Sequence, residues 1–251
     1  GLHLFRKKGV QFLHHLNGMY AGAIFSRKEN RVILFRDRFG IKPLYYTRKG
    51  DDLFFASEIK PLLEGTDEKP VFNRAALPKF FSYRYVPGEE TMFKGIWKLP
   101  PGSYMEVDLN TGAASVHRYW EYRFDRVNHS LSMDEAAEEF FRLFSDAVDL
   151  RLKADVEVGS FLSGGIDSSA VASLAADRKK DINLFTIFFK EEGYNELPQV
   201  QEFIQAHKDR FREARLNTAL CSSELLGKLP SIIRSVEEPV SLGTLLPTDQ
   251  V

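Results

Sequence analysis

The chain has 251 residues, a length typical of one large domain or two smaller ones. Its 34 Lys and Arg residues nearly balance 35 Asp and Glu residues, which argues against nucleic acid or an anionic membrane as the main partner. The single cysteine, Cys221, excludes an internal disulfide. The apolar stretch from Met19 to Phe25 is far shorter than the roughly 20 residues that span a bilayer, and no signal-peptide pattern opens the chain. These features lead us to expect a cytoplasmic protein.

The first third of the sequence predicts a β-rich fold. Apolar residues between Leu2 and Leu16 have helical spacing, with a break near Gly9. After this helix, short apolar runs separated by turn residues predict an antiparallel meander. The runs are residues 20–25, 32–35, 43–46 and 53–56.

A second set of short elements follows. Residues 73–85 predict a helix with Asn73 as its N-cap, and Gly-containing turns then separate further strands that include residues 103–107. The polar, aperiodic residues 124–131 are interpreted as a linker. We therefore expect a first domain over residues 1–123 and a second over residues 132–251.

The second domain has a different pattern. Ser132 and Glu135 have the spacing of a capping box, which predicts a helix that runs to about Leu152. A strand, a polar turn, a helix and a strand follow without hairpin turns, which predicts a βαβ unit and a parallel sheet. These segments are residues 156–162, 163–169, 170–177 and 184–189. The fold class expected is α+β followed by α/β.

The polar turn SGGIDSS carries the chemistry. It lies where a parallel sheet places its ligand, at the carboxyl end of a strand and the start of a helix. The glycines let the backbone approach an anion, and the helix adds free N–H groups and the positive end of its dipole. Asp167 would repel a phosphate unless a cation lay between them, so we expect Mg²⁺. A plain capped turn is the structural alternative, and the missing Lys-Ser/Thr pair excludes the P-loop of kinases and GTPases.

This turn resembles the pyrophosphate loop of the ATP pyrophosphatase superfamily, whose members cleave ATP between its α and β phosphates to adenylate an acceptor oxygen. The first domain resembles the second half of a class II glutamine amidotransferase domain, an αββα sandwich of the Ntn type. Its matching segments are LNGMYAGAIF at residues 16–25, RDRFGIKPLYY at residues 36–46 and FASEIK at residues 55–60. Together with IWKLPPG, RYW, EEP and LPT further on, this order is similar to the glutamine-hydrolysing asparagine synthetase family. Because the sequence opens on Gly1 rather than Met, we interpret it as an internal fragment.

The resemblance implies a site for ATP and pyrophosphate. Its residues are Leu162, Ser163, Gly164, Gly165, Asp167, Ser168, Ser169 and Ile187. Leu162 and Ile187 would flank the adenosine through backbone contacts or serve only as core residues, and Asp167 would hold Mg²⁺. Tyr194-Asn195-Glu196 matches a short acidic segment of the family, whereas HKDR at residues 207–210 departs from its usual His-Leu-Gly-Thr run.

The first domain offers no glutaminase residue. The family's cysteine nucleophile and its partners precede the segment present here, so this fragment alone is not expected to hydrolyse glutamine. Cys221 lies in the second domain and is not a candidate nucleophile. We expect Asp37 and Arg38 to fix a loop by ion pairing, and Glu58 to cap or anchor the turn after its strand.

For the full-length parent, the resemblance implies ATP-dependent amidation of aspartate to asparagine through an acyl-adenylate, with glutamine as nitrogen donor. Glutamine, aspartate and ATP would be its substrates, and a homodimer is a compatible assembly. Two alternatives stay open. One is a related amidotransferase that acts on another carboxylate, such as a polysaccharide or antibiotic precursor. The other is a non-catalytic homologue that binds or regulates.

Overall fold

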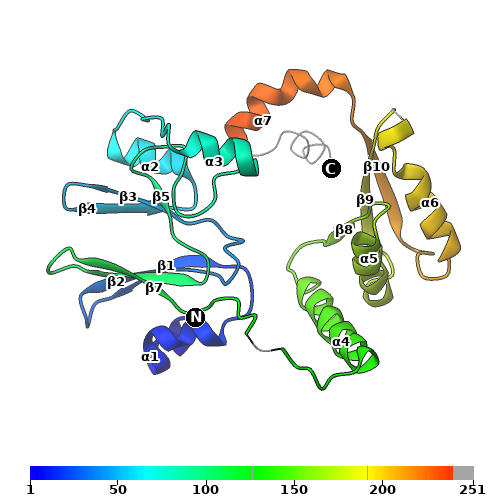
Figure 1. Ribbon diagram of the computed structural model, residues 1–251, viewed down its shortest axis with the longest axis horizontal. Coiled ribbons are helices and arrows are strands. Elements are labelled where there is room, and N and C mark those ends of the chain that lie inside the picture. Colours follow the sequence, from blue (N-terminus) through cyan, green and yellow to red (C-terminus); the bar gives the residue numbers. More distant parts are fainter. Residues whose placement is uncertain (126, 191, 240–251) are drawn as a thin grey trace. The chain divides into compact units, whose positions relative to one another are not determined.

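A computed structural model of the chain describes residues 1–125, 127–190 and 192–239 (Figure 1). The chain forms two compact units. The first contains residues 1–125 and 235–239, and the second contains residues 127–234 without residue 191. The sequence prediction assigned residues 235–239 to the second domain. The structure groups them with the first unit, where Glu237 and Glu238 form ion pairs.

Two antiparallel sheets form the first unit. One has the strand order β1-β2-β6-β7 and the other has the order β4-β3-β5. The strands are β1 (Ala21–Ser26), β2 (Arg31–Arg36), β3 (Tyr45–Lys49), β4 (Asp52–Ala56), β5 (Trp97–Lys98), β6 (Ser103–Asp108) and β7 (Ala114–Arg118). The expected strands are present, but the continuous meander is wrong. Its first and second halves form hairpins in different sheets, because the chain turns away after β2.

Short helices flank these sheets. They are α1 (Leu2–Lys8), the 3-10 helix η1 (Gly9–His15), α2 (Ile59–Thr66) and α3 (Ala76–Tyr83). The expected break near Gly9 is confirmed, since Gly9 has a φ of 56°. Asn73 is not the N-cap of α3, because the helix begins later and Ala75 holds that position. The Asn73 side chain instead accepts a hydrogen bond from the Ala75 N–H in a local turn.

Asp37 organises the turn at which the chain leaves β2. Its side chain is buried, and its carboxylate accepts hydrogen bonds of 3.0 to 3.2 Å. The donors are the backbone N–H groups of Tyr20, Phe39, Ile41 and Lys42. A buried carboxylate surrounded by N–H groups satisfies donors that would otherwise be costly to bury. Asp37 therefore fixes the loop, as the sequence suggested.

Arg36 supports the same turn by donating hydrogen bonds, whereas Asp37 accepts them. Its guanidinium donates to the backbone carbonyl groups of Gly40, Lys42 and Leu99 at 2.7 to 2.8 Å. An ion pair between Asp37 and Arg38 was expected, but the structure shows none. The loop is held by bonds from two buried charged side chains to the backbone, because the turn contains more backbone groups than its own chain can pair.

A parallel sheet forms the second unit, with the order β10-β9-β8. Its elements are α4 (Met133–Arg151), β8 (Gly159–Phe161), α5 (Ile166–Arg178), β9 (Asn183–Phe188), η2 (Glu192–Tyr194), α6 (Leu197–Ala206), β10 (Arg215–Leu220), η3 (Ser223–Lys228) and the start of α7 (Leu229–Ser235). Helix α4 packs on α5, α5 contacts β8, and α6 contacts β9. The predicted βαβ unit and parallel sheet are confirmed.

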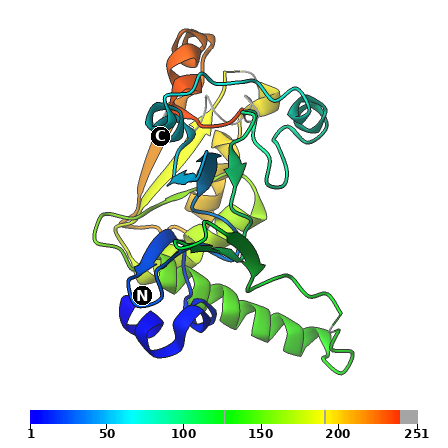
Figure 2. The same cartoon turned by 90° about the vertical axis from the view of Figure 1, so that its left-hand side faces the viewer.

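The start of α4 follows a local sequence rule. The Ser132 hydroxyl accepts from the Glu135 N–H at 3.3 Å, and the Glu135 carboxylate accepts from the Ser132 N–H at 2.8 Å. The capping box is thus confirmed at the start of α4, which runs as one long helix (Figure 2). Buried apolar side chains from the strands and helices, including Leu162, Leu184 and Val200, form the core.

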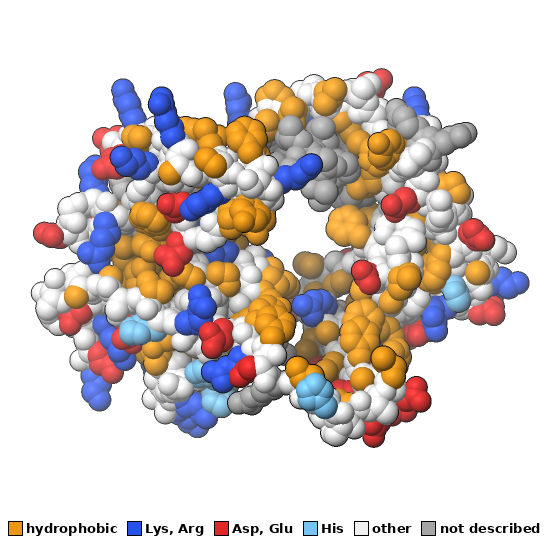
Figure 3. Space-filling model, in the orientation of Figure 1, with side chains coloured by type: hydrophobic (Ala, Val, Ile, Leu, Met, Phe, Trp, Pro, Cys, Tyr) orange, Lys and Arg blue, Asp and Glu red, His pale blue; other side chains and the backbone are white. Residues whose placement is uncertain are grey.

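Charges are mixed over the surface. On the face shown in Figure 3, acidic and basic side chains are interspersed on both units, in agreement with a formal net charge of −1. Among the described helices, none is long and apolar enough to cross a membrane.

Asp37→Ala should destabilise the first unit by about 3 kcal/mol, because it removes a buried carboxylate and leaves four part-buried N–H groups without their acceptor. Urea unfolding followed by circular dichroism would measure the loss. Asp51→Ala is the matched control, since Asp51 is exposed in the turn between β3 and β4. Equal stability of the two variants would show that the Asp37 carboxylate does not hold the turn.

Candidate functional site

The predicted loop lies at the carboxyl end of β8. The Leu162 N–H donates to the Phe185 carbonyl at 2.8 Å, which extends the pairing of β8 with β9 by one residue. Helix α5 already begins at Ile166, so residues 167–169 lie in its first turn. The connection between strand and helix is therefore residues 162–165, shorter than the turn predicted from the sequence.

Two serine hydroxyls close this connection. The Ser168 hydroxyl lies 2.7 Å from the Ser163 hydroxyl and accepts from the Ser163 N–H at 3.1 Å. The Gly165 N–H donates to the Ser163 hydroxyl at 3.3 Å. The N–H groups of Ile166 and Asp167, in the first turn of α5, donate to no group of the described residues, as is usual at a helix start. They remain available to an anion.

Gly164 lies against the start of α6. Its N–H donates to Oε2 of Glu196, the N-cap residue of that helix, at 3.0 Å. A Cβ on Gly164 would lie 3.3 Å from the Cβ of Gln199, so a side chain there would displace the helix or the loop. Close packing rather than a positive φ therefore favours glycine here. The sequence singled out Glu196 as part of an acidic segment but gave no signal that it contacts the loop.

Asp167 is exposed in the first turn of α5, where the helix dipole favours a carboxylate. Within the described residues, no three or more His, Cys, Asp or Glu side chains come together as a metal site. Magnesium sites are commonly completed by one or two carboxylates and the phosphates of a substrate. Asp167 fits that kind of site.

Leu162 and Ile187 differ in their surroundings. The Leu162 side chain is 2% exposed and belongs to the core, so only its backbone can reach a ligand. Ile187 is partly buried in β9, where it pairs with Ala219 of β10. Both lie at the carboxyl end of the sheet, but their contact with adenosine stays a prediction.

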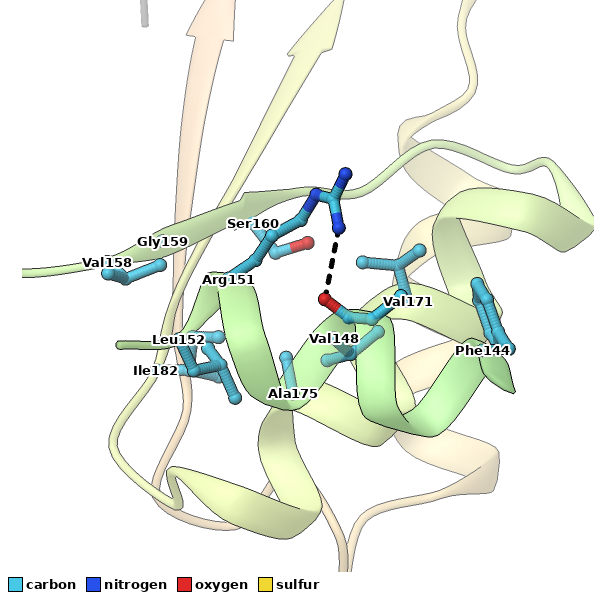
Figure 4. A pocket seen from close by; sticks show the side chains of 11 residues that line it. Phe144, Val148, Arg151, Leu152, Val158, Gly159, Ser160, Val171, Ala175 and Ile182 are labelled. Carbon is cyan, nitrogen blue, oxygen red and sulfur yellow. Dashed lines mark hydrogen bonds between the residues drawn. The ribbon is translucent and has the colours of Figure 1, made fainter. Parts of the chain in front are cut away.

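A separate pocket of about 380 Å³ lies between α4, α5 and β8 (Figure 4). Its lining is mainly apolar, with Phe144, Val148 and Ile182 among the side chains. The Arg151 guanidinium there donates to the Ala147 carbonyl at 3.1 Å. Residues 163–169 do not line this pocket, so it is distinct from the predicted nucleotide site.

The EEP segment lies in the first unit. Glu237 Oε2 accepts hydrogen bonds from the backbone N–H groups of Ile59 and Lys60, and Oε1 lies 2.7 Å from the Lys60 ammonium. Glu58 holds the N-cap position of α2, but its side chain makes no capping bond. The expectation that Glu58 caps this turn is therefore wrong, and Glu237 supplies the carboxylate instead.

Glu238 lies in a more enclosed position. Its Oε2 accepts from the Lys98 ammonium at 3.1 Å, with the two side chains 14% and 13% exposed. Its Oε1 is buried without a hydrogen-bond partner among the described residues. Burial raises the pKa of Glu238, although the Lys98 charge opposes the shift. Burial and the nearby Glu238 charge also raise the pKa of Tyr45 to about 12.

Comparison with known proteins connects both units. The model of a glutamine amidotransferase domain matches residues 2–120, and the asparagine synthase model matches residues 139–248. Asparagine synthetase [glutamine-hydrolyzing] 2 of Bacillus subtilis (strain 168) is 36% identical over 78% of this chain and 27% of its own length. The chain belongs to the glutamine-hydrolysing asparagine synthetase family.

A second Bacillus subtilis relative, asparagine synthetase [glutamine-hydrolyzing] 1, is 30% identical over 92% of this chain and 35% of its own length. The chain thus spans about a third or less of these asparagine synthetases. Among solved structures, glutamine phosphoribosylpyrophosphate amidotransferase from B. subtilis is 12% identical, with a TM-score of 0.33 over 96% of this chain and 44% of its own.

Ser168→Ala should loosen the asparagine synthetase loop. It removes the acceptor of the Ser163 N–H, so we expect exchange of that amide proton to rise about fivefold, as for loss of one net hydrogen bond. Hydrogen exchange followed by NMR would measure the rate. Ser169→Ala is the control, since the Ser169 hydroxyl has no hydrogen-bond partner in the described part of the chain. The same Ser163 exchange rate in both variants would contradict the role of Ser168.

Glu237→Gln and Glu238→Gln should change stability with opposite dependence on pH. Burial alone would raise the pKa of Glu237, but hydrogen bonds from Lys60 and Ile59 outweigh it and lower that pKa. The stabilising effect of the Glu237 carboxylate is therefore lost as pH falls through the lowered pKa. The pKa of Glu238 is raised, so its favourable contribution is lost as pH rises through the raised pKa.

Urea unfolding between about pH 3 and pH 8 would compare these variants with the unsubstituted chain. With rising pH, Glu237→Gln should become relatively less stable and Glu238→Gln relatively more stable. Parallel curves for the two variants would show that the two carboxylates have similar environments.

Proposed function

We propose that the full-length protein is a cytoplasmic enzyme that uses ATP to convert aspartate to asparagine, with ammonia supplied by glutamine hydrolysis. The observation that carries this proposal is the connection of residues 162–165, which ends a parallel strand and leads directly into the N-terminus of α5. The free N–H groups of Ile166 and Asp167 in the first turn of α5, together with the neighbouring serine hydroxyls, suit a pyrophosphate group. The names of the relatives and the order of the two matched domains support the substrates.

The proposed chemistry follows from the poor reactivity of a carboxylate. An acyl-adenylate has a good leaving group, so ammonia can displace AMP and leave an amide. Donors fixed before the reaction stabilise the charge that develops on the departing pyrophosphate. In this chain those donors are the first-turn N–H groups of α5, together with the hydroxyl of Ser169. Asp167 would hold Mg²⁺, which when bound neutralises phosphate charge.

The first unit would belong to the ammonia-producing domain. Its two antiparallel sheets, with α1 and η1 before the first strand and α2 and α3 between β4 and β5, agree with part of an αββα sandwich. The turn held by the buried side chains of Arg36 and Asp37 supports the fold rather than the chemistry. We assign no glutaminase catalytic residue within this chain.

In the full-length protein, Asp167→Ala should lower aspartate-dependent exchange between ATP and pyrophosphate at least about 100-fold, because it removes charge compensation at the phosphates. Glutaminase activity should persist, since the substitution lies in the other unit. Radiolabelled pyrophosphate exchange and glutamate release would measure the two activities.

Asp181→Ala is the matched control, because Asp181 is exposed next to the opposite, amino-terminal end of β9. Full exchange activity in Asp167→Ala would remove Asp167 from the mechanism. Exchange that depends on a different carboxylate would identify another acceptor. An unsubstituted protein that neither binds ATP nor exchanges pyrophosphate would favour a non-catalytic homologue.

A further inference from the structure

Glu196 places a negative charge on the proposed pyrophosphate loop. Its carboxylate Oε2 accepts from the Gly164 N–H at 3.0 Å, and the residue is exposed at the N-terminus of α6. The Gly164 Cα lies close to the first turn of this helix, which keeps the carboxylate within reach of the loop. A carboxylate oxygen thus occupies the position in which a phosphate oxygen would accept the same bond.

The other N–H groups of the connection are used differently. Those of Ser163 and Gly165 donate to the hydroxyl groups of Ser168 and Ser163, which are neutral and can rotate. Only at Gly164, within this connection, does an ionisable side chain take the bond. An anion that needs the Gly164 N–H must therefore displace a charged competitor.

Asp167 adds a second negative charge at the first turn of α5. Two carboxylates next to one anion-binding loop disfavour a free polyanion, since unit charges of the same sign repel over a few ångströms even in water. A polyphosphate that carries a divalent cation has less net charge and meets less repulsion.

We propose that Glu196 is a specificity-determining residue: its carboxylate holds the Gly164 N–H in the absence of ligand and makes binding of a pyrophosphate group depend on a divalent cation. The inference rests on the proposed function of the loop. Glu196 is a competitor of the anion in this scheme and is not a ligand of the metal.

Isothermal titration calorimetry of the 251-residue chain tests the proposal with two probes, sodium pyrophosphate in EDTA and magnesium pyrophosphate. Glu196→Gln keeps an oxygen that accepts from Gly164 but removes the charge. We expect this variant to bind metal-free pyrophosphate about fivefold more tightly than the unsubstituted chain. Its affinity for magnesium pyrophosphate should change by less than about twofold, because the cation already offsets the charge.

Glu202→Gln is the matched control. Glu202 is an exposed residue of the same helix, about 9 Å further along its axis, and its substitution should leave both affinities unchanged. Unchanged affinities in Glu196→Gln would overturn the proposal. Weaker binding of magnesium pyrophosphate alone would also overturn it, by making Glu196 a metal ligand. If the unsubstituted chain bound neither probe, the proposed function of the loop would fail, and the inference with it.

Discussion

The second unit depends on how residues 162–165 satisfy their own backbone N–H groups in a very short space. Leu162 still pairs with β9, and Ile166 is already helical, so no additional turn fits between them. Side chains therefore supply the hydrogen-bond acceptors for these N–H groups, namely the serine hydroxyls and Glu196. At the nucleotide site that we propose, a ligand with stronger acceptor oxygens would replace these bonds without unfolding either element. The same short connection would then serve both the fold and the binding of an anion.

In the first unit, side chains also pair with the backbone groups of a connection, but these bonds are permanent. Where the chain passes from one sheet to the other, Asp37 collects backbone N–H groups and Arg36 collects backbone carbonyl groups. Both side chains are buried, so a ligand cannot replace these contacts. Charged residues in a family motif can therefore be present because the fold needs them. RDRFG helps to identify the family for this reason, although it contacts no reacting group in our proposal.

Local pattern predicted the elements well and their partners poorly. Alternating and helical spacing revealed the strands, the break at Gly9 and the βαβ unit, because each reflects burial within a few residues. The capping box was equally local. The split of the meander, the cap of α2 and the bond from Gly164 to Glu196 depend on residues that are distant in sequence, and periodicity contains no information about such pairs. The expected length of the turn at residues 163–169 was wrong, because the sequence around a Gly-Gly pair does not indicate the residue at which α5 begins.

The carboxylate that caps α2 comes from a residue 178 positions later in the chain. During synthesis on a ribosome, both sheets of the first unit emerge long before Glu237, and the first turn of α2 has no such acceptor until the parallel sheet of the second unit has also been made. Final consolidation of this unit is consequently a late event. A truncated polypeptide that stops at the apparent linker would contain every strand of the unit yet lack a piece of its structure. Recombinant dissection at that point would yield a different molecule from the one in the intact protein.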